Sequence, residues 1–120
     1  MKNKDPNGGG TGLASSDEAE KRRRFNRILI ESICSSMEFG ETVLYFLELT
    51  GPVKRNEIAD KPEVFAAELE SLLGDGARII LERIVENLYS SLNIEYEETA
   101  KKRFPESVRD AFKKYLKKTC

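Results

Sequence analysis

The chain has 120 residues, with 20 Lys and Arg against 21 Asp and Glu and no His, which gives a formal net charge of -1. This length predicts one domain, and no apolar run approaches the roughly 20 residues that a membrane-spanning helix needs. The lack of His and the presence of only two Cys exclude the common zinc modules and the catalytic sites that depend on imidazole. We therefore expect no enzyme, no metal and no cofactor.

Charge is unevenly distributed along the chain. Residues 1–24 carry six basic and four acidic side chains, residues 25–98 carry six and fifteen, and residues 99–120 carry eight and two. Basic ends thus flank an acidic middle. Either the ends contact a polyanion such as nucleic acid or an anionic membrane, or they pair with the acidic body of the same chain. We favour the second interpretation.

Residues 1–16 are predicted to be a disordered tail, and residues 17–120 a single helical domain. The tail is rich in Gly and polar residues, and Leu13 is its one large apolar residue. Such a segment buries too little apolar surface to offset its chain entropy. Its glycines lack the preceding strand and the following Lys-Ser/Thr of a phosphate-binding loop. The tail also lacks the apolar region of a secretory signal, so we expect a cytoplasmic protein.

The first helix is predicted to run from about Ser16 to a break at residues 39–40. Ser16 or Asp17 can cap free backbone amides at its start. Apolar residues then recur every three or four positions, which is the spacing of one helical stripe. Because this stripe is long for so small a core, we predict self-association through part of it, namely Phe25, Ile30, Ile33 and Met37.

Four consecutive basic residues stand in the first half of this helix, and they are Lys21, Arg22, Arg23 and Arg24. Such a run can bind the phosphates of a nucleic acid or another anion. It can also be a solvated helical turn that Glu18 and Glu20 partly neutralise, which is the commoner case.

The second helix is predicted to follow Gly40, a residue that suits the left-handed position at the end of the preceding helix. Residues 43–49 are apolar nearly all round. A helix of this kind is usually buried on every side. We therefore predict that this helix and the fourth one are central, and we assign Tyr45 and Phe46 to packing rather than to a pocket.

The middle of the chain carries clear signals for where helices begin and end. One helical turn is expected within residues 52–59, and Pro62 suits the first turn of a third helix over residues 62–73. The Gly74-Asp75-Gly76 corner then leads into a fourth helix over residues 77–92, which Asn93 closes. This corner is interpreted as a turn between helices rather than as an anion-binding nest.

The carboxy-terminal stretch, residues 95–120, is predicted to form a short helix over residues 95–104 and a longer one from Pro105. The longer helix is amphipathic, and its basic residues are Arg109, Lys113, Lys114, Lys117 and Lys118. They are candidate contacts for nucleic acid, an anionic membrane or an acidic protein. Alternatively, the helix docks its apolar face on the core and points its lysines at solvent, and we favour this interpretation.

Residues 43–59 resemble the opening helices of winged helix-turn-helix regulators, which would make residues 62–73 the recognition helix. That helix carries three Glu and no Lys or Arg, whereas binding to phosphates needs cations. The next segment, residues 77–92, has the pattern of a helix rather than of a two-stranded wing.

A second resemblance covers residues 28–92. Its motifs are Leu44-Tyr45-Phe46-Leu47-Glu48, Lys61-Pro62-Glu63-Val64-Phe65 and Gly74-Asp75-Gly76-Ala77. In these motifs the chain resembles a family of small archaeal helical domains, the Nitrosopumilus output domains, which occur alone or attached to signalling proteins. The resemblance implies a helical fold and a role in signalling or protein interaction, and it implies no catalytic residues.

These observations predict an all-α fold, a compact orthogonal bundle of five to six helices with its core in residues 28–92. The leading hypothesis for function is a non-catalytic protein-interaction or signalling output module, homodimeric or bound to a protein partner. The alternative is a nucleic-acid-binding regulator that uses the basic terminal segments and loses affinity steeply with salt. Cys34 lies near the apolar stripe of the first helix and is expected to be an inert thiol.

Overall fold

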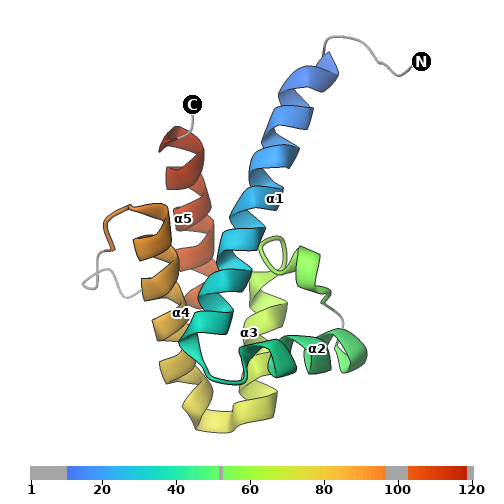
Figure 1. Ribbon diagram of the computed structural model, residues 1–120, viewed down its shortest axis with the longest axis vertical. Coiled ribbons are helices and arrows are strands. Elements are labelled where there is room, and N and C mark those ends of the chain that lie inside the picture. The colour runs from blue at the N-terminus through green and yellow to red at the C-terminus, as the bar shows by residue number, and fades with distance from the viewer. Residues whose placement is uncertain (1–10, 52, 97–102, 119–120) are drawn as a thin grey trace.

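The computed structural model describes residues 11–51, 53–96 and 103–118, with only the helical backbone described for residues 11–16. These residues form helices and no strand, as the sequence predicts (Figure 1). The helices are α1 (Thr11–Ser36), α2 (Gly40–Thr50), α3 (Pro62–Leu73), α4 (Ala77–Leu92) and α5 (Phe104–Lys118), with the short 3-10 turns η1 (Arg55–Glu57) and η2 (Gly74–Gly76).

The predicted number of helices is slightly off, and one helix start was misplaced. The turn expected within residues 52–59 is only the three-residue η1. Ile94, Glu95 and Tyr96 are not helical, and residues 97–102 of the expected short helix lie outside the described residues. Helix α1 begins at Thr11, five residues before the predicted Ser16, because adding turns to a formed helix costs far less than starting one. Residues 1–10 of the predicted tail also lie outside the described part.

Helices α3 and α4 have the bounds that the sequence predicts. Pro62 stands at the first position of α3, where its missing N–H leaves no bond unmade. Asn93 ends α4 in the left-handed conformation, with φ 58° and ψ 47°. This conformation lets the N–H of Ile94 donate to the carbonyl oxygen of Tyr89, at 3.1 Å, so a free carbonyl at the helix end is satisfied.

Gly40 has a different role from the predicted one. It is the first residue of α2, and among the described residues Gly74 is the glycine with a positive φ. A Cβ atom on Gly40 would lie 2.7 Å from the Cα of Cys34 in α1. A glycine is therefore needed here because the start of α2 lies directly against the backbone of α1, and not because a helix ends in the left-handed conformation.

Helix α4 is central, as predicted, because it contacts α1, α3 and α5. Phe65 of α3 packs its ring against Phe104 of α5, with centroids 5.7 Å apart. The fully buried side chains come from every α-helix and from the segment that joins α2 to α3; the largest are Phe25, Phe65, Leu29, Ile33, Leu44, Ile58, Leu69, Ile84, Leu88, Val53 and, in α5, Val108. The core therefore holds residues of α1 and α5 as well as those of the predicted core segment, 28–92.

Helix α2 is not central, which corrects the prediction. It lies across the end of the bundle that is distant from the chain termini, with α1 as its main neighbour (Figure 1). Its inner face, formed by Gly40, Val43, Leu44 and Leu47, is buried. On its other side Tyr45, Phe46 and Leu49 are exposed.

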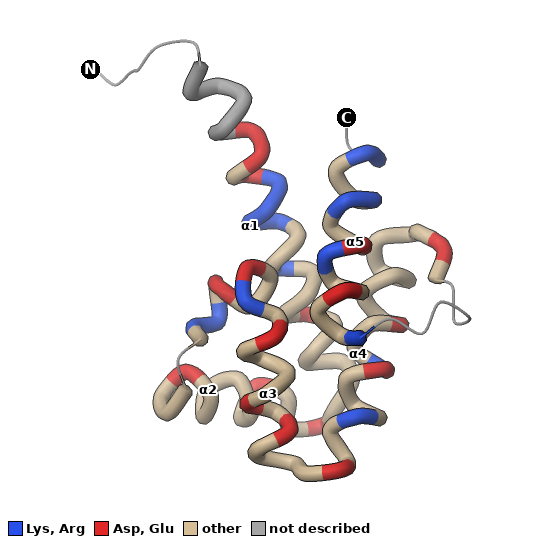
Figure 2. Tube along the Cα trace, turned by 180° about the vertical axis from the view of Figure 1, so that it is seen from behind, with Lys and Arg blue, Asp and Glu red and all other residues tan. Residues whose placement is uncertain are grey.

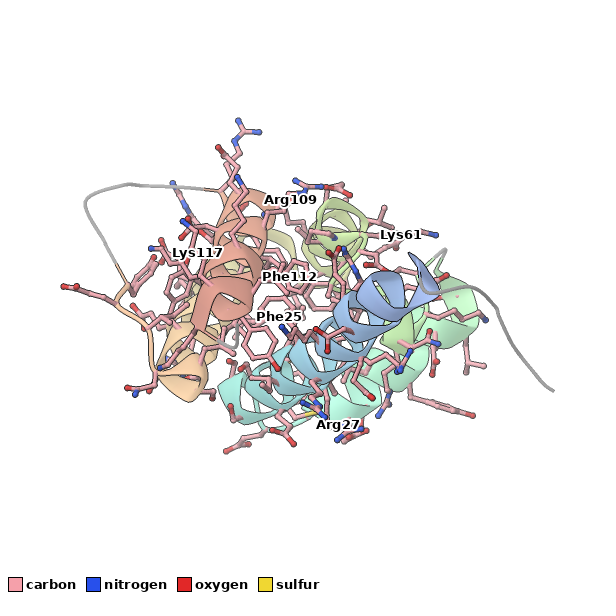
Figure 3. All side chains as sticks on the ribbon, turned by 90° about the horizontal axis from the view of Figure 1, so that it is seen from above. Phe25, Arg27, Lys61, Arg109, Phe112 and Lys117 are labelled. Atoms are coloured by element: carbon pink, nitrogen blue, oxygen red, sulfur yellow. The ribbon has the colours of Figure 1, made fainter. Side chains whose placement is uncertain are left out.

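Helix α5 docks its apolar face on the core, which is the interpretation favoured from the sequence. Val108, Ala111 and Tyr115 are buried. Figure 3 shows Phe112 facing Phe25 of α1, and their ring centroids are 5.0 Å apart. This contact joins the first and last helices and leaves the lysines of α5 on the outside.

Candidate functional site

The two basic segments lie at the same end of the molecule. Figure 2 shows the Lys and Arg residues concentrated on α5 and on the part of α1 nearest the amino terminus, whereas acidic residues predominate on α3. These segments are far apart in the sequence and come together because α5 packs beside α1. The fold thus brings the predicted candidate anion contacts into one region.

Most of the basic cluster on α1 is paired with carboxylates. Lys21 lies 3.4 Å from Asp17, Arg22 lies 3.6 Å from Glu18, and Arg23 lies 3.5 Å from Glu20. The Nη1 of Arg22 also donates to the Oδ1 of Asp60, at 2.9 Å. Within the described part of the chain, Arg24 alone of the four has no ion pair.

The basic residues of α5 also divide into some that have partners within the chain and some that have none among the described residues. Arg109 pairs with Glu63 of α3, and Lys114 lies 3.1 Å from Asp110. The Nζ of Lys118 donates to the carbonyl oxygens of Leu92 and Asn93, at 3.2 and 2.7 Å, where it caps the end of α4.

Three of the nine predicted anion contacts therefore remain without a partner among the described residues, and they are Arg24, Lys113 and Lys117. All three are exposed. The other six hold parts of the same chain together or are neutralised by it. Arg22 additionally lies over the ring of Phe112, 4.7 Å from its centroid, so it helps to fasten α1 to α5.

Most of the residues that were predicted to mediate self-association on α1 are buried. Phe25, Ile33 and Met37 are buried in the core, and only Ile30 is half-buried. The stripe was judged too long for a small core, but α4 and α5 together cover it. Phe25, Ile33 and Met37 therefore cannot mediate association while the fold is intact, and Ile30 is the one of the four that is partly exposed.

The exposed apolar side chains stand on α2 instead. Tyr45, Phe46 and Leu49 are 60%, 45% and 66% exposed. With Thr42 they occupy positions i, i+3, i+4 and i+7, so they share one helical face. We call these four residues the outer face of α2. The sequence did carry the signal for this surface, a helix with more apolar residues than one buried stripe requires, but the signal was interpreted as complete burial.

Cys34 lies half-buried on α1, at the edge of the α1–α2 contact. Its thiol donates a weak hydrogen bond to the Oε1 of Glu41, at 3.6 Å. Burial, and then the nearby charge of Glu41, raise the pKa of this thiol above its ordinary value. Cys34 therefore remains protonated at neutral pH, which is the state of an unreactive cysteine.

We find neither a metal-binding group nor a membrane-spanning helix among the described residues. Among them, no three His, Cys, Asp or Glu side chains are grouped so that they could hold a metal ion. In the same part of the chain, no helix has the length and apolar character needed to cross a membrane. Comparisons of the chain with protein families, curated proteins and solved structures found no match. The features that bear on function are therefore the exposed apolar and basic surfaces of the molecule.

Proposed function

We propose that the chain is a non-catalytic protein-interaction module that forms a homodimer through the outer face of α2. The observation that carries this proposal is the exposure of Tyr45, Phe46 and Leu49 on one face of a single helix. Aromatic and long aliphatic side chains of this kind supply most of the binding energy at protein interfaces. An exposed patch of them is costly in water unless a partner covers it.

A second copy of the chain is the occupant that the chemistry of this face favours. The outer face of α2 carries no charge, so two copies can approach each other about a twofold axis without placing like charges in contact. Of the two acidic residues that flank it, Glu41 forms an ion pair with Arg55 at 2.9 Å, and Glu48 is held by the backbone N–H of Arg55, which donates to it at 3.3 Å.

The resemblance to small archaeal helical output domains agrees with this proposal. A domain of that kind passes on a signal by contact rather than by chemistry, and we place it in the cytoplasm on the same basis. The alternative, a nucleic-acid-binding regulator, has weaker support because six of its nine candidate cations already have intramolecular partners.

Sedimentation equilibrium tests the homodimer. The parent chain should show about twice its mass of 13.6 kDa at micromolar concentrations. The double variant Phe46→Ser, Leu49→Ser should be a monomer with unchanged helicity, because both side chains are exposed.

A matched control removes two exposed apolar side chains from elsewhere. Leu72→Ser with Ile79→Ser changes residues at the α3–α4 corner that are also exposed, and it should leave the dimer intact. A parent chain that stays monomeric, or a dimer lost in the control and retained in the α2 variant, would show that the proposal is wrong.

A further inference from the structure

A groove of about 890 Å³ lies between α1 and the segment that joins α2 to α3. Arg23, Asn26 and Arg27 line one wall, and Lys54 and Arg55 line the other. The two walls are about 30 residues apart in the sequence. Figure 3 shows Arg27 pointing away from Phe112 of α5. The lining of the groove includes no residue of the outer face of α2 and none of the basic residues of α5.

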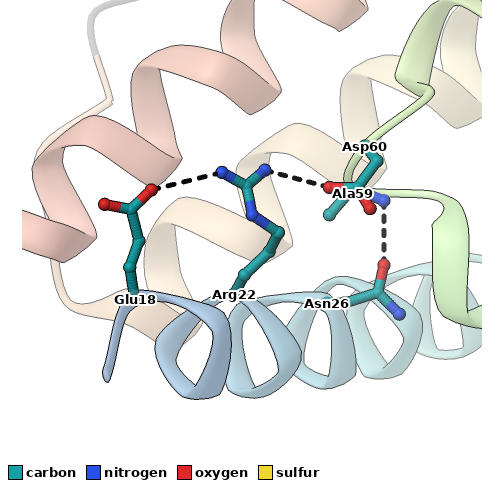
Figure 4. A network of polar contacts seen from close by, with 5 residues as sticks. All are labelled: Glu18, Arg22, Asn26, Ala59 and Asp60. Carbon is teal, nitrogen blue, oxygen red and sulfur yellow. Dashed lines mark hydrogen bonds and ion pairs between the residues drawn. The ribbon is translucent and has the colours of Figure 1, made fainter. Parts of the chain in front are cut away.

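Asn26 fixes the two walls relative to each other. Its side chain is buried, its Oδ1 accepts the N–H of Ala59 at 2.8 Å, and its Nδ2 donates to the carbonyl oxygen of Arg55 at 3.0 Å. Figure 4 shows the first of these bonds beside the Arg22–Asp60 ion pair, which joins the same two segments. A ligand would therefore meet a groove that is already formed, which lowers the entropic cost of binding.

The groove holds more positive charge than its own carboxylates can neutralise. Five cationic side chains line it, against Glu48 and Asp60. Asp60 is engaged by Arg22, and Glu48 accepts the backbone N–H of Arg55. Arg27 and Lys54 are exposed, and neither has an ion pair within the described residues. Among the described residues, Arg23 has its ion pair with Glu20, an exposed pair at 3.5 Å that a stronger anion can displace.

We propose that this groove binds a phosphate monoester, held by Arg23, Arg27 and Lys54. A guanidinium group matches two oxygens of a phosphate at once, and an ammonium group adds a further charge. The volume falls in the range of sites for small ligands. No aromatic ring among the described residues lines the groove, so it offers no surface on which a nucleic-acid base could stack. A small phosphorylated molecule or a phosphoserine side chain fits this chemistry better than a nucleic-acid strand does.

Titration of the full chain, labelled with the NMR-active isotope of nitrogen and followed in two-dimensional proton–nitrogen NMR spectra, tests the proposal. The probes are inorganic phosphate, a phosphoserine peptide, the same peptide without phosphate, and a short single-stranded DNA. Phosphate and the phosphopeptide should shift the backbone signals of residues 23–27 and 54–56 and the Nε signal of Arg27. Equal affinity for both points to a small phosphorylated ligand, and tighter binding of the phosphopeptide points to a modified protein.

Two charge-matched double variants separate the groove from general electrostatic attraction. Arg27→Gln with Lys54→Gln should weaken phosphopeptide binding by about tenfold or more, because charge-assisted hydrogen bonds are lost. Lys113→Gln with Lys117→Gln removes the same charge from exposed residues of α5 and should change affinity less than about twofold, since neither residue lines the groove and salt screens their charge. Equal loss in both variants, signal shifts confined to α5, or DNA binding tighter than that of the phosphopeptide would overturn the proposal.

Discussion

Helices α4 and α2 use apolar residues in opposite ways. Helix α4 buries one continuous stripe, from Ala77 to Leu92, and its exposed side is rich in charged residues. Helix α2 buries its inner face against α1 and leaves Tyr45, Phe46 and Leu49 in contact with water. The two helices thus differ in how their exposed apolar residues are arranged, because α4 exposes Ile79 alone among its large apolar residues, whereas α2 exposes three that share one face.

This difference shows why apolar content alone is a poor guide to burial. A helix that is apolar on all sides is buried only if the chain supplies neighbours on all sides. Helix α4 has such neighbours in α1, α3 and α5, whereas α2 has mainly α1. A surplus of apolar residues on a peripheral helix indicates a surface that a further molecule can cover.

The largest expected effect follows from replacing leucine by alanine in the two helices. Leu88 of α4 is fully buried, so Leu88→Ala should lower the free energy of unfolding by about 3–4 kcal/mol, because it leaves a cavity in the core. Leu49→Ala on the outer face of α2 should change it by less than about 0.5 kcal/mol.

Urea denaturation at protein concentrations low enough to keep the chain monomeric measures both values. Leu44→Ala, on the inner face of α2, serves as the control, because it tests a buried leucine in the same helix as Leu49. Similar losses for Leu44→Ala and Leu49→Ala would mean that the two faces of α2 do not differ, and the comparison would fail.

The sequence predicts the parts of this fold that local chemistry determines. Pro62 and Asn93 mark helix ends through their own backbone preferences, so the bounds of α3 and α4 were predicted correctly. The exposure of α2 depends on which helices pack against it, and that is decided by the whole chain. Spacing within the first helix identified a buried stripe correctly but could not tell a stripe covered by α4 and α5 from one covered by a second copy.

The candidate sites were also hard to predict from the sequence, because they too depend on how the whole chain packs. The groove was missed because Arg27, Lys54 and Arg55 come from the acidic middle of the chain, where the net charge conceals them, and only the fold brings them beside Arg22 and Arg23. Three of the nine basic residues predicted at the ends have distant partners that the sequence did not reveal: Asp60 for Arg22, 38 positions away, Glu63 for Arg109, and the carbonyl oxygens at the end of α4 for Lys118. Ion pairs of this range form only after the helices have packed.

A smaller effect is expected from the polar contact that holds the α2 side of the molecule to α1. Asn26→Ala should lower the free energy of unfolding by about 1–3 kcal/mol, because it leaves the N–H of Ala59 and the carbonyl of Arg55 without their partner. Chemical denaturation measures the loss. Asn56→Ala, an exposed asparagine in the same segment, is the matched control and should be nearly neutral. If both variants were neutral, the attachment of this segment would depend on the buried Val53 and Ile58 and on the Arg22–Asp60 ion pair rather than on Asn26.

The smallest expected effect concerns the surface contacts of Arg22. Arg22→Ala removes its ion pairs with Glu18 and Asp60 and its contact with Phe112, and it should lower the free energy of unfolding by about 0.5–1 kcal/mol at low salt. Arg24→Ala, on the same helix and without an ion pair among the described residues, should have no measurable effect. Part of the difference should vanish in 1 M salt, where charges are screened. A loss that salt leaves unchanged would instead assign the role of Arg22 to packing against Phe112, so that even the charged contacts of α1 would stabilise the bundle chiefly through apolar surface.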